Sequence, residues 1–375
     1  MSTLDELVYY CRNEHPIGAL VLLGESGCGK TYLIDKDLQN ALRDSHYIVR
    51  VSLFGINSID ALNTAVKRQW IYTVSSFLTK LSKQSSQMEL GKGFVRAFNS
   101  ILRTVIPQTE GLTDAIQNST DFIVIMPEVE NPYTGEKKKV ILVFDDIDRT
   151  ELDWLELLGT INNYCENQHF NTILIANRNY FHEIDPETMG IIRAAKEKTI
   201  AYTVLNSPDY EGIVHRVITG RNWEPEEYGE FLKEHEQMIL EVFGSEPLGM
   251  SATAPLSKHH NIRTLTTALE SFHRIYCHMT NALVRDIDPY FRSFLAFYLV
   301  VKSGIFKNGN TCFECTDAEI GKLYPDFSAD HLFESVRRWI RFGSWDGDLF
   351  LEELSRVSPV DMTELLSDED TALPG

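Results

Sequence analysis

The chain has 375 residues, a formal net charge of −19 and an apolar fraction of 43%. This length predicts two or three domains with a sizeable core, and the charge disfavours a protein whose whole surface binds nucleic acid or an anionic membrane. The acidic start Met1–Glu6 lacks a signal-peptide pattern, and the six cysteines are scattered. We therefore expect a cytoplasmic protein with free thiols and no membrane attachment.

Strands alternate with helices along the first 206 residues. The predicted strands are short apolar runs at 19–23, 47–53, 122–126, 140–144, 171–176 and 199–205. The predicted helices are 4–12, 30–43, 59–83, 94–105, 152–167 and 186–196. The residues from about 82 to 138 form a less regular, polar insert. This alternation predicts an α/β domain with a parallel sheet between two layers of helices.

A glycine-rich turn follows the first strand. Its sequence, G-E-S-G-C-G-K-T, matches the phosphate-binding loop of nucleoside triphosphatases, which runs from a buried strand into a helix. In such a loop Lys30 reaches the β- and γ-phosphates and the Thr31 hydroxyl ligates Mg²⁺. The N-terminus of the following helix faces the anion. The predicted nucleotide contacts are Gly24, Glu25, Ser26, Gly27, Cys28, Gly29, Lys30, Thr31 and Tyr32.

Two carboxylates follow the strand at 140–144, which is apolar throughout, as expected of a strand buried on both faces. Ligands of parallel sheets bind where the strands end. We expect Asp145 to be the Mg²⁺ partner and Asp146 to be the catalytic carboxylate that orients or deprotonates water. The other interpretation is a strand that ends in an acidic helix cap, with Asp148 capping the next helix.

Three further residues are candidates for sensing the γ-phosphate. Asn177 and Arg178 follow the strand at 171–176 and compete for the role of holding the attacking water or the γ-phosphate. Arg263 begins a later helix, from where it reaches back to the γ-phosphate and links nucleotide state to domain angle. The candidates for a cation that acts on a neighbouring subunit are Arg149, Arg193 and Lys198.

The chain beyond residue 206 contains no further convincing strand. Helices are predicted at 208–219, 225–243, 262–282, 285–305, 316–323, 329–342 and 347–356. The expected domains are the core at 1–206, a helical lid at 207–282, a helical or winged-helix-like module at 283–358 and an acidic tail at 359–375.

The order of these motifs resembles the AAA+ and STAND superfamilies of P-loop ATPases, and most closely the KAP family of P-loop NTPases. The narrower segments are V-S-L-F-G-I-N-S-I-D at 51–60, V-F-D-D-I-D-R at 143–149 and E-K-T-I at 197–200. The similarity covers about residues 10–280. It implies a five-stranded core sheet in the order 5-1-4-3-2 with a helical lid.

The resemblance also implies roles for single residues. Asn177 or Arg178 would be sensor 1 and Arg263 sensor 2. It further implies a bacterial protein, with a role in anti-phage defence as one setting. Many members of the family carry membrane helices inside the ATPase domain, whereas the insert at 82–138 is polar here. A typical AAA+ protein has Asp-Glu where this chain has Asp145-Asp146. The side chain of Asp146 is therefore one methylene shorter than the usual Glu base, and the resemblance does not predict the turnover rate.

Three functions follow from these observations. The first is a Mg²⁺-dependent ATP-hydrolysing switch that assembles with itself or with an effector protein. The second is a regulatory scaffold that binds nucleotide and turns over little. The third is a nucleic-acid-dependent ATPase, against which the charge of −19 counts. ATP is the expected nucleotide, because the guanine-reading N/T-K-x-D pattern is absent where it would be needed.

Overall fold

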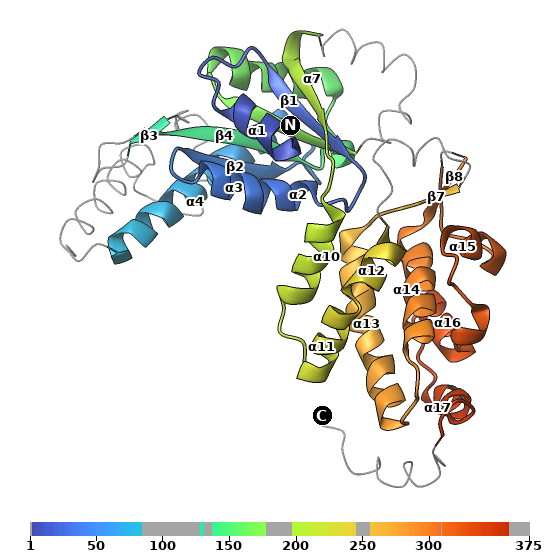
Figure 1. Ribbon diagram of the computed structural model, residues 1–375. Coiled ribbons are helices and arrows are strands. Elements are labelled where there is room, and N and C mark those ends of the chain that lie inside the picture. Colours follow the sequence, from blue (N-terminus) through green and yellow to red (C-terminus); the bar gives the residue numbers. More distant parts are fainter. Residues whose placement is uncertain are drawn as a thin grey trace, which may run out of the picture. The chain divides into compact units, whose positions relative to one another are not determined.

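The computed structural model describes residues 2–84, 128–130, 137–177, 197–244, 256–308 and 310–359, without the side chains of 74–84 and 130. The chain divides into two compact units, Met1–Ser207 and Pro208–Gly375 (Figure 1). The predicted helices at 94–105 and 186–196, the predicted strand at 122–126 and the acidic tail from 360 onward lie outside the described residues.

The first unit is built on a parallel sheet. Its five core strands are β1 (Ala19–Gly24), β2 (His46–Ser52), β4 (Lys137–Asp145), β5 (Asn171–Asn177) and β6 (Ile200–Leu205). They lie in the order β2-β4-β5-β1-β6, with every neighbouring pair parallel. Counted in chain order, this is 5-1-4-3-2 read from the other edge, so the predicted order of the core strands is confirmed.

The sheet differs from the prediction in one detail, a sixth strand. β3 (Glu128–Glu130) pairs antiparallel with the start of β4. Glu128 lies across from Lys139 in the register, and its carboxylate lies 3.7 Å from the Lys137 ammonium, so the run of lysines at the start of β4 meets an opposite charge on the neighbouring strand.

Both faces of the central strands β1, β4 and β5 are buried, which explains their continuous apolar runs, whereas the edge strand β6 is partly exposed. Alternate residues of β1 divide between two cores: Leu20 and Leu22 pack into one, Ala19 and Val21 into the other. The first core is covered by α1 (Thr3–Cys11) and by the helix after the loop, which is made of α2 (Lys30–Tyr32), the π-helical turn η1 (Leu33–Leu38) and α3 (Gln39–Leu42). The second core is covered by α4 (Ile59–Gln84) and by α7 (Trp154–Asn162), which continues into the π-helical turn η3 (Asn163–Asn167).

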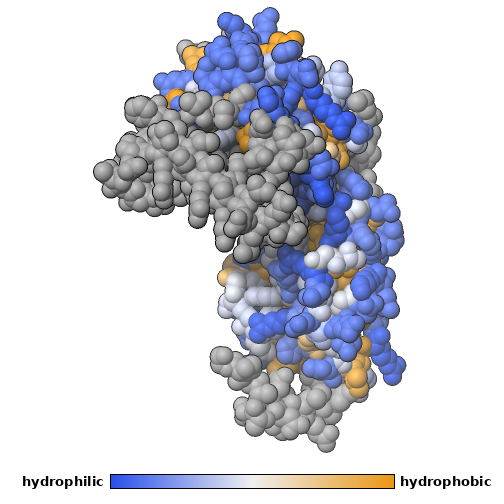
Figure 2. All heavy atoms as spheres, turned by 90° about the vertical axis from the view of Figure 1, so that its left-hand side faces the viewer, coloured by the Kyte–Doolittle hydropathy of each residue, from blue (hydrophilic) through white to orange (hydrophobic). Residues whose placement is uncertain are grey.

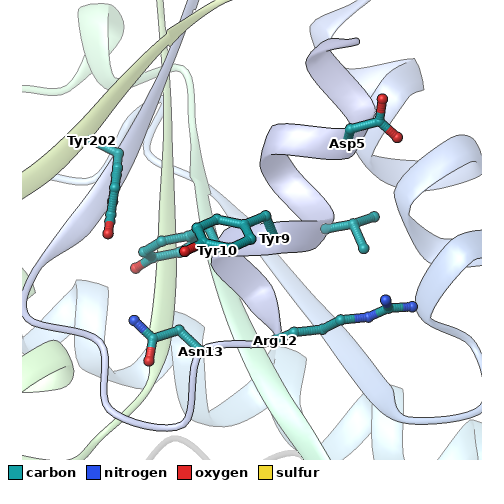
Figure 3. Close-up of a pocket in the computed structure, with 7 residues that line it drawn as sticks. Asp5, Tyr9, Tyr10, Arg12, Asn13 and Tyr202 are labelled. Atoms are coloured by element: carbon teal, nitrogen blue, oxygen red, sulfur yellow. The ribbon is translucent and has the colours of Figure 1, made fainter. Parts of the chain in front are cut away.

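One buried tyrosine fixes α1 to the sheet. The Tyr10 phenol lies 2.8 Å from the Gly18 carbonyl oxygen and 3.0 Å from that of Thr172, and it accepts a hydrogen bond from the Thr172 N–H at 3.0 Å. Figure 3 shows the pocket of about 480 Å³ that Tyr10 lines together with Tyr9 and Tyr202, between α1 and β6. The Asp5 carboxylate, which also lines this pocket, accepts the Ser2 N–H as part of the cap of α1.

The second unit contains eight of the α-helices that the structure describes. They are α10 (Tyr210–Thr219), α11 (Glu226–Glu234), α12 (Glu236–Phe243), α13 (Ile262–Asn281), α14 (Asp288–Ser303), α15 (Asp317–Leu323), α16 (Glu334–Phe342) and α17 (Gly347–Ser355). A short 3₁₀ turn, η4 (Ala329–His331), precedes α16. Most of these helices lie at the predicted positions, but the helix predicted at 225–243 is interrupted at His235 and forms α11 and α12, and the one predicted at 329–342 is the turn η4 followed by α16.

A single hydrophobic core joins the predicted lid to the predicted C-terminal module. It runs from Val214 to Leu354 and is centred on α14, whose buried side chains include Phe291, Phe294 and Phe297. A helix that is apolar on all sides is expected at the centre of a bundle. The described residues between 208 and 359 therefore form one packed body.

The prediction of an all-helical region after residue 207 is wrong. The short strands β7 (Leu256–Lys258), β8 (Ile305–Lys307) and β9 (Asn310–Cys312) form an antiparallel sheet. The helix predicted at 285–305 ends earlier because Gly304 adopts φ 81°, a left-handed conformation that glycine adopts without strain. Three-residue strands are too short to show a period of two, which is why they escaped the prediction.

A buried histidine makes the stability of the second unit depend on pH. His260 is 3% exposed beside Lys258, and burial lowers its pKa to about 4. The unfolded chain binds a proton near pH 6.5 while the native state does not, so the free energy of unfolding should fall by about 3 kcal/mol as the pH drops from 6.5 to 4. Urea denaturation across this range measures it. In His260→Gln we expect a flatter dependence, and an unchanged slope would contradict this assignment.

The hydrophilic surface seen in Figure 2 agrees with the many charged residues of the sequence. On the face shown in Figure 2, the described residues are mostly hydrophilic and apolar residues appear in small groups. Within the described ranges, no helix combines the length and apolar character that crossing a membrane requires.

Candidate functional site

The carboxyl ends of the parallel strands bring the predicted polar residues to one edge of the sheet. The register pairs Gly24 at the end of β1 with Asn177 at the end of β5. It pairs Asp145 at the end of β4 with Ser52 at the end of β2. Residues more than 100 positions apart in sequence therefore share one edge, where ligands of such sheets bind.

The loop Gly24–Thr31 has the backbone that a phosphate cradle needs. Gly27 and Gly29 adopt φ 78° and φ 88°, a region in which side-chain-bearing residues are strained. Lys30 folds back over the loop, and its ammonium donates to the carbonyl oxygens of Gly24 and Glu25, each at 2.7 Å. The ammonium thus lies against the loop from which its helix starts, in position to meet an anion. Tyr32 is 44% exposed.

Gly24 is required by close packing. A Cβ at this position would lie 2.8 Å from the Cys28 sulfur and 3.2 Å from Lys30 Cδ. We expect Gly24→Ala to displace the loop and weaken ATP binding on the order of tenfold, because phosphate contacts depend on its backbone. Gly159→Ala is the control, since a Cβ on this exposed helical glycine would meet nothing within 4 Å. That variant should bind ATP normally and gain roughly 0.5–1 kcal/mol of stability. Normal binding by Gly24→Ala would contradict the assignment.

Thr31 and Asp145 meet as the predicted metal ligands should. The Thr31 hydroxyl donates to Asp145 Oδ2 at 3.0 Å, and the Asp146 N–H donates to Asp145 Oδ1 at 2.9 Å. The Asp145 side chain is 8% exposed. Burial, together with the nearby Asp146 charge, raises its pKa, while the Thr31 hydrogen bond opposes this rise. A hydroxyl and a carboxylate on adjacent elements are the oxygen donors that Mg²⁺ prefers, so these residues fit the metal.

Asp146 is held in a left-handed conformation directly after β4, with φ 57° and ψ 38°. Its Oδ2 accepts a hydrogen bond from the Ser52 hydroxyl at 2.8 Å, and its Oδ1 lies 3.9 Å from the Arg149 guanidinium. The alternative of an acidic cap is not what the structure shows for the next helix: Asp148 lies in the 3₁₀ turn η2 (Ile147–Arg149), and Asp153 caps α7.

The remaining candidates have different positions. Asn177 lies beside the loop at the end of β5, whereas Arg178 and Arg193 lie outside the described residues. Lys198 precedes β6 and so lies toward the amino edge of the sheet, opposite the loop. Arg263 is exposed in the first turn of α13, which Asn261 caps. Its contact with the γ-phosphate would join the two units and stays a prediction.

Asn206 and Arg50 contact this site although the sequence did not single them out. The side-chain amide of Asn206 donates to the Cys28 carbonyl oxygen at 3.2 Å and lies at the same distance from the Cys28 sulfur. The backbone N–H of Asn206 donates to the Leu23 carbonyl oxygen at 2.7 Å. The Cys28 thiol is thus buried under the loop. Asn206 follows β6 as Asn177 follows β5, so the same rule, polar residues after strand ends, would have found it.

The comparisons agree with this geometry at the level of the family. The family model described as the KAP family P-loop domain matches residues 3–241, more than half of the chain. No curated protein matches the chain significantly.

Two solved structures show weaker likeness. Cdc6p from Pyrobaculum aerophilum is 14% identical over 94% of this chain and 84% of its own, with a TM-score of 0.42. The Drosophila ORC structure bound to DNA is 12% identical over 99% of this chain and 84% of its own, with a TM-score of 0.31. At TM-scores below 0.5 neither likeness identifies a partner.

Proposed function

Because the chain belongs to the KAP family of P-loop NTPases, we propose that it binds ATP with Mg²⁺ at the carboxyl edge of the sheet, hydrolyses it, and uses nucleotide state to control its assembly. The observation that carries this proposal is the contact of the Thr31 hydroxyl with Asp145 Oδ2 at 3.0 Å, across 114 residues. It joins the loop to the carboxylate strand as a metal–nucleotide site requires.

The loop residues bind and orient the triphosphate. Backbone N–H groups from Gly27 to Thr31 surround the phosphate oxygens, and the Lys30 ammonium exchanges its carbonyl contacts for the β- and γ-phosphates. Thr31 and Asp145 would hold Mg²⁺, which neutralises charge that develops on the transferred phosphoryl group. The raised pKa of Asp145 reflects its burial, and a bound cation favours the charged form that the site needs.

Asp146 is the group that we assign to the attacking water. Its side chain is 35% exposed, so solvent reaches it, and it lies next to the metal carboxylate. It accepts the proton that water loses, or orients water for attack on the γ-phosphate. Asn177 orients the same water or the γ-phosphate from the neighbouring strand. Arg178 is the alternative candidate for this role.

The connection to the second unit supports the switch. Asn206 contacts Leu23 and Cys28 of the loop region, and the second unit begins at Pro208. We propose that a change in the loop reaches the second unit along this short stretch of chain. Arg263 adds a charge that responds to the γ-phosphate and sets the angle of that unit. For the biological setting we carry forward the family expectation, a bacterial switch in anti-phage defence that assembles with itself or with an effector.

Phosphate release and mass test this proposal together. We expect steady release of phosphate from ATP with Mg²⁺, none with EDTA, and a particle mass that differs between ATP and ADP. Lys30→Ala should remove both effects. Phosphate release without any change of mass would retain the ATPase and refute nucleotide-controlled assembly.

One observation favours a second function, a scaffold that binds nucleotide and turns over little. Both oxygens of Asp146 face partners, Ser52 at 2.8 Å and Arg149 at 3.9 Å, so neither oxygen is free to meet a water molecule without giving up a contact. The scaffold predicts tight ATP binding with turnover no faster than that of Asp146→Asn. A nucleic-acid-dependent ATPase has no comparable support, and DNA-stimulated, salt-sensitive turnover would be its signature.

A further inference from the structure

An arginine shares the metal carboxylate. Asp145 Oδ2 accepts from the Thr31 hydroxyl at 3.0 Å and also lies 3.3 Å from Nη1 of Arg50. Arg50 comes from β2, which pairs directly with β4. A permanent positive charge therefore stands beside the oxygen that the proposed function gives to Mg²⁺. Arginine remains charged at every physiological pH, so this neighbour competes with a metal cation for the same carboxylate.

A second carboxylate holds that arginine. Arg50 Nε and Nη2 each lie 2.9 Å from one oxygen of Asp35, a two-bonded fork that fixes both position and plane of the guanidinium. Asp35 lies in the π-helical turn η1, one turn after Thr31. The contact with Asp145 is made by Nη1 alone, at the longer distance of 3.3 Å. The two carboxylates thus share one guanidinium unequally, and the two-bonded pairing with Asp35 lies away from the metal site.

Stability alone does not explain this arrangement. The Asp35 and Arg50 side chains are 39% and 32% exposed, so solvent screens part of what this pair contributes to folding, even with its two-bonded geometry. The Asp145 side chain is only 8% exposed, so its electrostatic attraction to Arg50 is screened less by solvent and is stronger. Without Asp35, the arginine fork is free to turn toward Asp145 and make the two-bonded pair there.

We propose that Asp35 is a positioning residue that holds Arg50 by its fork and so keeps Asp145 available to the Mg²⁺ of the bound nucleotide. This inference rests on the proposed nucleotide site and adds how its affinity for the metal is set. Asp35 itself is not a ligand in this account. It acts through Arg50, so replacing Asp35 should have no effect once Arg50 is replaced by an uncharged residue.

The test measures how much Mg²⁺ nucleotide binding requires. A fluorescent, non-hydrolysable ATP analogue is titrated onto the full chain at a series of Mg²⁺ concentrations, and in EDTA. We expect Asp35→Asn to raise the Mg²⁺ concentration at half-saturation about fivefold, the size of coupling usual for charges in contact, with binding in EDTA unchanged. Asp35→Asn combined with Arg50→Met should return the Mg²⁺ requirement to within about twofold of the wild type.

Asp37→Asn is the matched control. It removes the same charge from the same π-helical turn, and among the described residues Asp37 has no ion pair. It should leave the Mg²⁺ requirement unchanged, and melting temperatures confirm that each variant folds. An Asp35→Asn variant with the wild-type Mg²⁺ requirement, or a double variant that stays as impaired as Asp35→Asn, overturns the inference while the nucleotide site stands. A wild-type protein that binds no nucleotide overturns both.

Discussion

Replacing Lys30 by alanine is expected to weaken ATP binding on the order of 100-fold, because charge-assisted hydrogen bonds to phosphate are among the strongest single contacts of such a site. Lys30 is the one cation within the loop Gly24–Thr31, and its ammonium lies 2.7 Å from two loop carbonyls. Its removal also breaks the hydrogen bonds to those carbonyls, so the loop loses two stabilising contacts as well as a positive charge. Equilibrium titration with an ATP analogue in Mg²⁺ measures the effect.

Lys36→Ala provides the comparison for this variant. Lys36 lies on the same helix, is exposed, and has no ion pair among the described residues. It should bind ATP as the wild type does, since a lysine on the solvent side contributes only a screened charge. If Lys30→Ala binds as tightly as Lys36→Ala, the ammonium does not reach the phosphates, and the loop has another role.

Replacing Asp146 by asparagine should reduce phosphate release by about 10²–10⁴-fold, the usual contribution of a general base. Asparagine has the same shape and retains an oxygen that accepts from the Ser52 hydroxyl, now 2.8 Å from Asp146 Oδ2. It also tolerates the left-handed backbone at φ 57°. Folding and ATP binding should therefore stay within about threefold of the wild type, so that only turnover changes.

Asp148→Asn separates this effect from the loss of a negative charge near the site. Asp148 lies two residues further, in the turn η2, and should leave turnover nearly unchanged. If phosphate release persists in Asp146→Asn while ATP still binds, Asp146 is not the base. If the wild type is already as slow as Asp146→Asn, the nucleotide-binding scaffold is the better description.

The elements of the first unit were predictable because their signals are local. A strand buried on both faces is apolar at every position, and a phosphate loop needs glycines at fixed spacings, as Gly27 and Gly29 show with their positive φ angles. The order of the strands came from the resemblance to a family. The sequence pattern alone predicts only that strands and helices alternate. The sheet confirms the order of the core strands that the family resemblance implies.

The neighbours of the site were harder to predict because distant strands supply them. Arg50 meets Asp145 through the pairing of β2 with β4, across 95 residues. The run Tyr47–Leu53 predicts an apolar strand, and its single charged residue, Arg50, is the only sign in it of this contact. Asp35 shows a related difficulty, because its partner becomes evident only when the helix after the loop is placed against β2.

The most direct test of the central claim is calorimetric titration of the wild-type chain with ATP, with and without Mg²⁺. A phosphate loop joined to Asp145 through Thr31 predicts one site per chain and affinity that increases when Mg²⁺ is present. The absence of a guanine-reading pattern predicts that ATP is preferred over GTP. Absence of binding heat in both conditions, with the protein folded, would contradict the assignment of the carboxyl edge as a nucleotide site.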